Sequence, residues 1–117
     1  MSMRAALAHL RERGAGRRLV AVLGGMAELG AGSPAYHREI GEAAAGAGVV
    51  VLVAVGDLAE GYLAGAAGVP ERQTVATADE AVAVLRDLLR PGDCVLVKGS
   101  RAIGLEAVCE ALLSVAA

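Results

Sequence analysis

Two patterns of hydrophobic positions alternate along the chain, short continuous runs and a helical spacing of three and four residues. The continuous runs predict strands that are buried on both faces of a parallel sheet, at 18–23, 49–55 and 94–97. A shorter stretch at 73–76 predicts a strand at the edge of the same sheet. The strands are separated by segments of helical spacing, so helices and strands are expected to alternate.

The helical segments have recognisable starts and buried faces. Apolar residues recur at i, i+3, i+4 and i+7 in a helix predicted from Ser2 to Arg13, with Ser2 as the N-cap. Further helices are predicted from Ser33-Pro34 to about residue 46, at 58–67, at 77–89 after a capping box, and at about 102–115. Their buried faces should carry Met3, Ala6, Leu7 and Leu10; Tyr36, Ile40, Ala44 and Ala47; and Ala78, Ala81, Val82, Leu85 and Leu89.

This order of elements predicts one α/β domain over residues 1–117, a Rossmann-like three-layer sandwich. Right-handed crossovers give a mostly parallel sheet of about four strands in the order 3-2-1-4, with helices on both faces. The first and fourth strands are then neighbours, and the chain reverses direction between them. Ligands of such sheets bind at that reversal, so the loops Gly24–Gly30 and Lys98–Arg101 are expected to flank one crevice.

Composition narrows the functional classes. The chain is 56% hydrophobic with only two aromatic residues, so its core must be aliphatic. A formal net charge of −2 gives no electrostatic reason to expect nucleic acid or an anionic membrane as partner. The first ten residues are too short and polar for a signal peptide, and no apolar run is long enough to span a bilayer. Cys94 and Cys109 are predicted to be reduced, buried thiols, and no residues have the spacing of a metal site.

The first loop of interest follows the first strand. Gly24-Gly25 ends the apolar run and Gly30 closes the loop, so the backbone can turn sharply there or approach a ligand closely. The loop lacks the G-x-G-x-x-G spacing of a dinucleotide site, and the chain has no P-loop of its own. Glu28 in this loop could accept a hydrogen bond from an ammonium or a ribose hydroxyl, or it could be a surface carboxylate paired with Arg101 or Lys98.

The second loop of interest, Lys98-Gly-Ser-Arg101, gives the sharper signal. It brings two cations, a hydroxyl and a flexible glycine to the start of a predicted helix, which suits a phosphate or a carboxylate. The alternative is that Lys98 and Arg101 are solvated residues of a polar loop. His37, in the first turn of the helix after the glycine loop, is either a hydrogen-bonded structural residue, the commoner case, or a general base.

Several of these stretches are similar to a known family. Val20–Gly30, His37, Val55-Gly56 and Pro91–Arg101 resemble motifs in the C-terminal domain of the Mur ligases, and Ser2–Leu7 resembles the start of that domain. The resemblance covers nearly the whole chain. Its strongest match is to the branch that adds D-alanyl-D-alanine (D-Ala-D-Ala) to UDP-N-acetylmuramoyl-tripeptide (UDP-MurNAc-tripeptide) in peptidoglycan synthesis.

The resemblance implies an ATP-dependent amide ligase of three domains in the bacterial cytoplasm, with this chain as the C-terminal one. ATP and Mg2+ would activate the tripeptide carboxylate as an acyl phosphate, and they would be held mainly by a central domain that this chain lacks. The binding residues implied here are Lys98, Gly99, Ser100 and Arg101 on one side, and Gly24, Met26, Glu28, Gly30 and His37 on the other; no catalytic residue and no metal ligand is implied.

Two departures accompany the resemblance. Gly25 stands where the family usually has Asp, which removes a carboxylate. The uridine-nucleotide domain and the central ATPase domain are missing, so the isolated chain is expected to be inactive. The alternative function is a non-catalytic Rossmann-like module that binds a small anion or a nucleotide.

Overall fold

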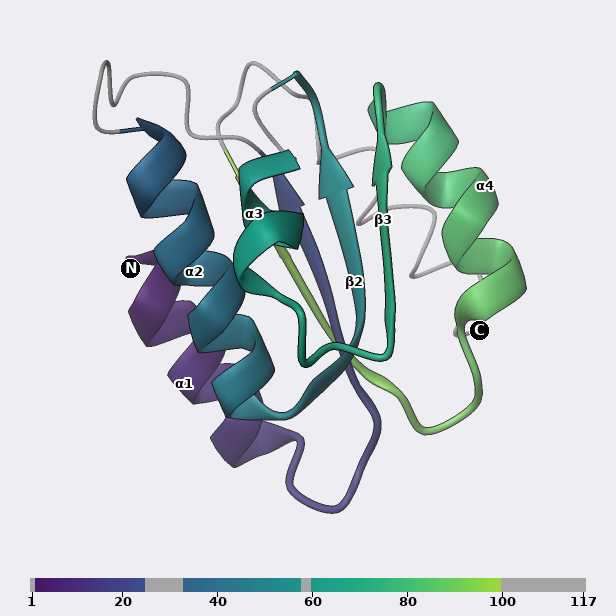
Figure 1. Cartoon of the computed structure of the whole chain (residues 1–117). Coiled ribbons are helices and arrows are strands. Elements are labelled where there is room, and N and C mark those ends of the chain that lie inside the picture. The colour runs from purple at the N-terminus through teal and green to yellow at the C-terminus, as the bar shows by residue number, and fades with distance from the viewer. Residues whose placement is uncertain (1, 25–32, 58–59, 100–117) are drawn as a thin grey trace.

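A four-stranded parallel sheet forms the centre of the protein in the computed structural model, which describes residues 2–24, 33–57 and 60–99 (Figure 1). Its order is β3-β2-β1-β4, which confirms the predicted 3-2-1-4 winding. Every neighbouring pair is parallel. The strands are β1 (Leu19–Gly24), β2 (Val49–Val55), β3 (Glu71–Val75) and β4 (Cys94–Lys98).

Helices cover both faces of this sheet, as Figure 1 shows. One face packs against three helices and the other against α4, so the three-layer architecture is confirmed. The helices are α1 (Met3–Arg13), α2 (Ser33–Ala47), α3 (Glu60–Gly65) and α4 (Ala78–Leu88). The helix predicted at 102–115 lies outside the described residues.

Strand alternation divides the apolar side chains into two cores. Leu19, Ala21 and Leu23 of β1 point toward α1, α2 and α3, whereas Val20 and Val22 point toward α4. All of these residues are buried. The apolar run therefore indicates what the sequence predicted, a strand buried on both faces, because a central parallel strand with helices on both sides has no solvated face.

Side-chain caps fix the starts of two helices. The hydroxyl of Ser2 accepts a hydrogen bond from the Ala5 amide at 3.1 Å, and the Thr77 hydroxyl accepts one from the Glu80 amide at 3.2 Å. The Glu80 carboxylate accepts in turn from the Ala76 amide at 2.8 Å. The usual capping box returns this carboxylate to the N-cap amide; here it reaches the residue before the cap.

The structure corrects the predicted burial at three places. β4 is half-buried along its whole length, and Cys94 is a half-buried free thiol, because β4 is the terminal strand of the described sheet and pairs only with β1. On α2, Ile40 and Ala44 are buried as predicted, but Tyr36 and Ala47 are only half-buried. On α4, Ala81 and Leu85 are buried as predicted, but Ala78 and Val82, and Leu89 at its C-cap, are only half-buried. Cys109 lies outside the described residues.

Smaller differences concern the ends of elements. β1 begins and ends one residue later than predicted, at Leu19 and Gly24. β3 begins two residues earlier and ends one residue earlier, at Glu71 and Val75, and β4 continues one residue further, to Lys98. The described part of the helix predicted at 58–67 is α3, which ends at Gly65. None of the helices within the described ranges is both long and apolar enough to cross a membrane.

Candidate functional site

The carboxyl ends of β1 and β4 bring the starts of the two candidate loops together. Leu23 on β1 pairs with Lys98 on β4 in the sheet register. The next residues, Gly24 and Gly99, therefore lie side by side just beyond the last pair of β1 with β4, while Gly24 still pairs with Val55 on β2. Gly24 is the last residue of β1, which is buried along its whole length. Lys98 is the last residue of β4, is half-buried, and is the basic residue of that strand. The geometry places a cation beside a glycine backbone at the ligand-binding edge of a parallel sheet.

Five of the predicted site residues cannot be placed. Met26, Glu28, Gly30, Ser100 and Arg101 lie outside the described residues, so their roles remain predictions. The structure places Gly24, Lys98, Gly99 and His37.

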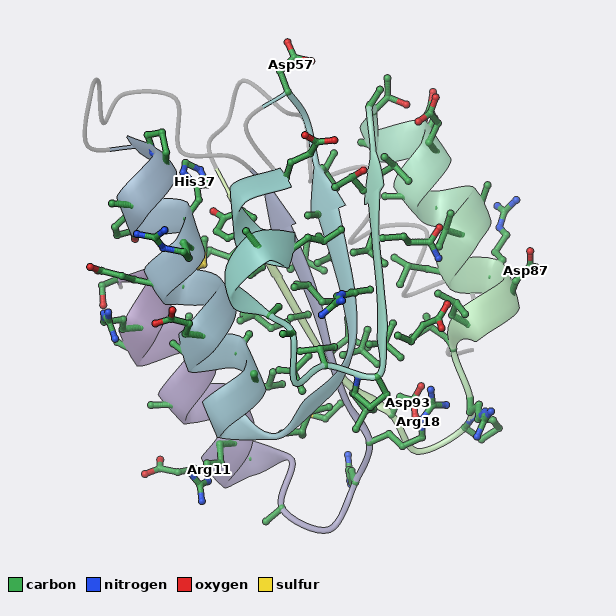
Figure 2. All side chains as sticks on the ribbon, viewed as in Figure 1. Arg11, Arg18, His37, Asp57, Asp87 and Asp93 are labelled. Carbon is green, nitrogen blue, oxygen red and sulfur yellow. The ribbon has the colours of Figure 1, made fainter. Side chains whose placement is uncertain are left out.

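His37 lies on α2 and is almost completely buried, with 1% of its surface exposed (Figure 2). Its ring centroid is 4.6 Å from that of Tyr62 on α3, at an interplanar angle of 58°. The ring of Tyr36 approaches it edge-on at 5.9 Å. A general base must be within reach of its substrate's proton, and this ring is enclosed by aromatic neighbours. The burial therefore favours the structural interpretation of His37 over the general base.

Tyr62 is a residue that the sequence analysis did not select. Its hydroxyl donates a buried hydrogen bond of 2.8 Å to the carbonyl oxygen of Gly24, where β1 ends. Burial, and to a smaller extent Tyr36, raises the pKa of the Tyr62 phenol well above its usual range. One signal was present in the sequence: an aromatic residue with a hydroxyl, in a chain with two aromatics, needs a hydrogen-bond partner when it is buried.

Close packing of α2 on α3 holds these rings in place. A β-carbon on Gly41 would overlap the carbonyl group of Tyr62, and one on Gly65 would overlap the carbonyl group of Arg38. A β-carbon on Gly61 would lie 2.7 Å from the β-carbon of His37. The two helix backbones thus approach closely only because all three positions are glycine, and this approach brings Tyr62 under the end of β1.

A carboxylate stands at the same edge of the sheet. Asp57 follows Gly56 at the carboxyl end of β2 and is exposed, at the upper end of the sheet in Figure 2. Gly56 has φ +100° and donates its amide to the carbonyl oxygen of Val75 on β3 at 2.9 Å. The sequence pattern offers Asp57 as an N-cap of the helix predicted at 58–67, and the fold also gives it a position beside the candidate site.

The described residues fit an anion better than a metal ion. Within the described ranges, no three His, Cys, Asp or Glu side chains are grouped to hold a metal. Lys98 and the neighbouring backbone can meet a phosphate or a carboxylate. Of the hollows lined by described residues, one of about 370 Å³ lies near Arg18 and Asp87, and one of about 250 Å³ lies between α1 and α2, both away from this edge.

Comparison with known proteins gives a consistent result. A family model described as "Mur ligase, glutamate ligase domain" matches residues 1–101. A UDP-N-acetylmuramoyl-tripeptide–D-alanyl-D-alanine ligase of Synechocystis sp. is 39% identical over 101 residues, covering 85% of this chain and 22% of the relative. The enzyme of the same name from Mycobacterium tuberculosis is 43% identical over 115 residues, covering 84% of this chain and 22% of the relative.

Solved structures agree with the sequence relatives. A crystal structure of MurF from Acinetobacter baumannii superposes with a TM-score of 0.83 and 30% sequence identity, covering 97% of this chain and 25% of that one. A second crystal structure of the same enzyme gives a TM-score of 0.80. The chain therefore spans about 22% of the length of these curated relatives and 25% of the solved enzyme.

Proposed function

The chain belongs to the Mur ligase family by its glutamate ligase domain, and on that premise we propose that it is the C-terminal domain of a MurF-type ligase. Such an enzyme joins D-alanyl-D-alanine to UDP-N-acetylmuramoyl-tripeptide at the expense of ATP. The relatives that carry this name come from bacteria, which supports a role in the bacterial cytoplasm.

One observation carries the proposal for the site. The register that pairs Leu23 with Lys98 sets the starts of the two candidate loops, Gly24 and Gly99, next to each other at the carboxyl edge. A ligand at this edge would meet a glycine backbone on one side and cations on the other. That chemistry suits a carboxylate, as in the dipeptide substrate, or a phosphate of ATP.

The proposed division of labour follows from what the chain contains. It has no P-loop, and no metal-binding group lies among the described residues, so ATP and Mg2+ would be held mainly by other domains of the enzyme. Lys98, Ser100 and Arg101 would contact the carboxylate or phosphate, with Gly99 allowing close approach. Residues 24–30, including Met26 and Glu28, would form the opposite wall. Closure of such a domain over the reacting groups excludes water, which protects an acyl phosphate from hydrolysis.

A chimeric enzyme tests this function. Residues 1–117 would replace the corresponding C-terminal part of the Mycobacterium tuberculosis relative, and ADP release would be measured with UDP-MurNAc-tripeptide, ATP–Mg2+ and D-Ala-D-Ala. We expect release that depends on all three substrates, whereas the relative lacking its C-terminal part should be inactive. A folded chimera without dipeptide-dependent turnover would contradict the proposal.

Binding to the isolated chain distinguishes the alternative function. The chain would be titrated separately with ATP–Mg2+ and with D-Ala-D-Ala. Tight binding of the nucleotide alone, with a Kd of about 1 μM (roughly −8 kcal/mol), combined with an inactive chimera, would identify an independent nucleotide-binding module instead of a ligase domain.

A further inference from the structure

We propose that Tyr62 is a positioning residue for the ligand site, which fixes the point where the chain leaves β1 beside Lys98. This inference rests on the proposed function for the identity of the ligand, but its structural core does not. In this proposal, the hydroxyl of Tyr62 on α3 orients the peptide group of Gly24 at the carboxyl edge of the sheet.

The hydrogen bond acts where the sheet stops holding the chain. The described pairing of β1 with β4 ends at Leu23 and Lys98, and Gly24 keeps only its pairing with Val55 on the other side. The hydroxyl of Tyr62, which lies on α3, donates a hydrogen bond of 2.8 Å to the carbonyl oxygen of Gly24. Glycine has the widest choice of backbone conformations, so a fixed contact on its carbonyl group determines the direction in which the loop begins.

The donor itself is held rigidly. Tyr62 is completely buried, and the ring of His37 lies against it at 4.6 Å. Gly41 and Gly61 let α2 and α3 approach so closely that a β-carbon on Gly41 would overlap the carbonyl group of Tyr62. His37 therefore belongs to the same device: it packs against the ring whose hydroxyl orients Gly24.

Protonation keeps this contact intact. The ordinary pKa of a phenol is about 10 and burial raises that of Tyr62 further, so the hydroxyl is a donor throughout the physiological pH range. A residue needed only to fill space would not require the hydroxyl, since phenylalanine has nearly the same shape. The hydroxyl is what separates a positioning role from simple packing.

The first test uses the chain itself and no ligand. Lys98 is the only lysine of the chain. Reductive methylation with 13C therefore places a single side-chain reporter at the site; the N-terminal amine is labelled as well and gives a separate signal. Tyr62→Phe should move the Lys98 methyl resonance and shift the Gly24 carbonyl resonance upfield. Tyr36→Phe, the same change in the other ring that contacts His37, should leave both resonances in place.

The second test measures turnover in the chimera. Tyr62→Phe should raise the KM for D-Ala-D-Ala about fivefold, the loss of roughly one hydrogen bond, with kcat nearly unchanged. A purely structural defect would lower the amount of active enzyme and hence kcat, with KM unchanged. Unchanged KM together with an unmoved Lys98 resonance would overturn the proposal.

The two tests separate the two hypotheses. If the wild-type chimera is inactive, the ligase function fails, while the Lys98 and Gly24 resonances still decide whether Tyr62 positions this edge. If Tyr62→Phe alone does not fold, the same comparison is made in a Gly46→Ala background. Gly46 is an exposed helical residue on α2 with no atom within 4 Å of an added β-carbon, so alanine there should stabilise both proteins.

Discussion

Gly41 on α2 faces the carbonyl group of Tyr62 on α3 so closely that no β-carbon fits between them. Gly41→Ala should therefore destabilise the domain by about 1–3 kcal/mol, because the two helices must separate to accommodate the methyl group. Chemical denaturation monitored by circular dichroism would measure this loss. The same variant should also move the Lys98 reporter resonance, since it displaces Tyr62.

The same helix supplies a control with the opposite sign. Gly46→Ala should stabilise the domain by about 0.5–1 kcal/mol, because alanine loses less backbone entropy in a helix and the added methyl group has free space. Equal effects of the two substitutions would show that helix propensity, and not the approach of α3, governs Gly41.

Much of this fold could be predicted because its signals are local. The charge-free run at 49–55 coincides with β2, residue for residue. The four apolar residues predicted to face inward from the first helix are the four buried residues of α1. Ser2 and Thr77 cap their helices with hydrogen bonds between residues three apart. Crossover handedness then gave the strand order, since it leaves few ways to connect these elements.

The parts that could not be predicted depend on contacts between distant segments. The Tyr62 hydroxyl meets Gly24 across 38 residues of sequence, and nothing in either neighbourhood indicates the other. The spacing of apolar residues predicted that Tyr36 would face the core at the start of α2. In the structure His37 does so instead, and its ring packs against the ring of Tyr62. The glycines at 41, 61 and 65 suggest flexibility when read alone, yet two helices in contact require them.

Asp93 lies directly before β4, at the end of the sheet opposite to the carboxyl edge (Figure 2). Its carboxylate accepts from the Arg90 amide at 2.9 Å and lies 3.5 Å from Nη1 of Arg18, while only 5% of its side chain is exposed. Asp93→Ala should cost about 1–3 kcal/mol, because it leaves the buried Nη1 of Arg18 without its counter-charge.

Asp87 is the matched control for that change, and thermal unfolding of both variants would measure the difference. It is an exposed aspartate in the last turn of α4, where a negative charge opposes the helix dipole. Asp87→Ala should leave stability unchanged or raise it slightly. A loss at Asp87 as large as that at Asp93 would mean that the Arg18 contact contributes nothing specific.

Alkaline pH should unfold the domain partly through Tyr62. The folded state raises the pKa of this phenol above the unfolded value of about 10. Above pH 10 the unfolded chain therefore loses a proton that the folded chain keeps, so the free energy of unfolding falls as pH rises, by up to about 1.4 kcal/mol per pH unit. Below pH 10 the contribution is constant. Urea denaturation at several pH values would measure the slope.

Tyr62→Phe provides the comparison for that slope. The variant lacks the titrating group, so its stability should fall less steeply above pH 10 than that of the wild type. Tyr36→Phe retains Tyr62 and should keep most of the wild-type slope, because burial is the larger cause of the raised pKa and Tyr36 the smaller one. Identical slopes for wild type and Tyr62→Phe would contradict the assignment of the alkaline transition to the buried phenol.

Lys98 should contribute its charge to ligand binding at the edge where β1 and β4 end. In the chimeric ligase, Lys98→Gln should reduce kcat/KM for D-Ala-D-Ala about 10- to 100-fold, the range of a hydrogen bond to a charged group. Lys98→Arg should recover part of that loss, because it restores the charge with a different shape. Arg86→Gln, in the last turn of α4, removes a cation far from this edge and should have no effect. Wild-type kinetics for Lys98→Gln would remove the carboxyl end of β4 from the ligand site, since Lys98 is the basic residue of that strand.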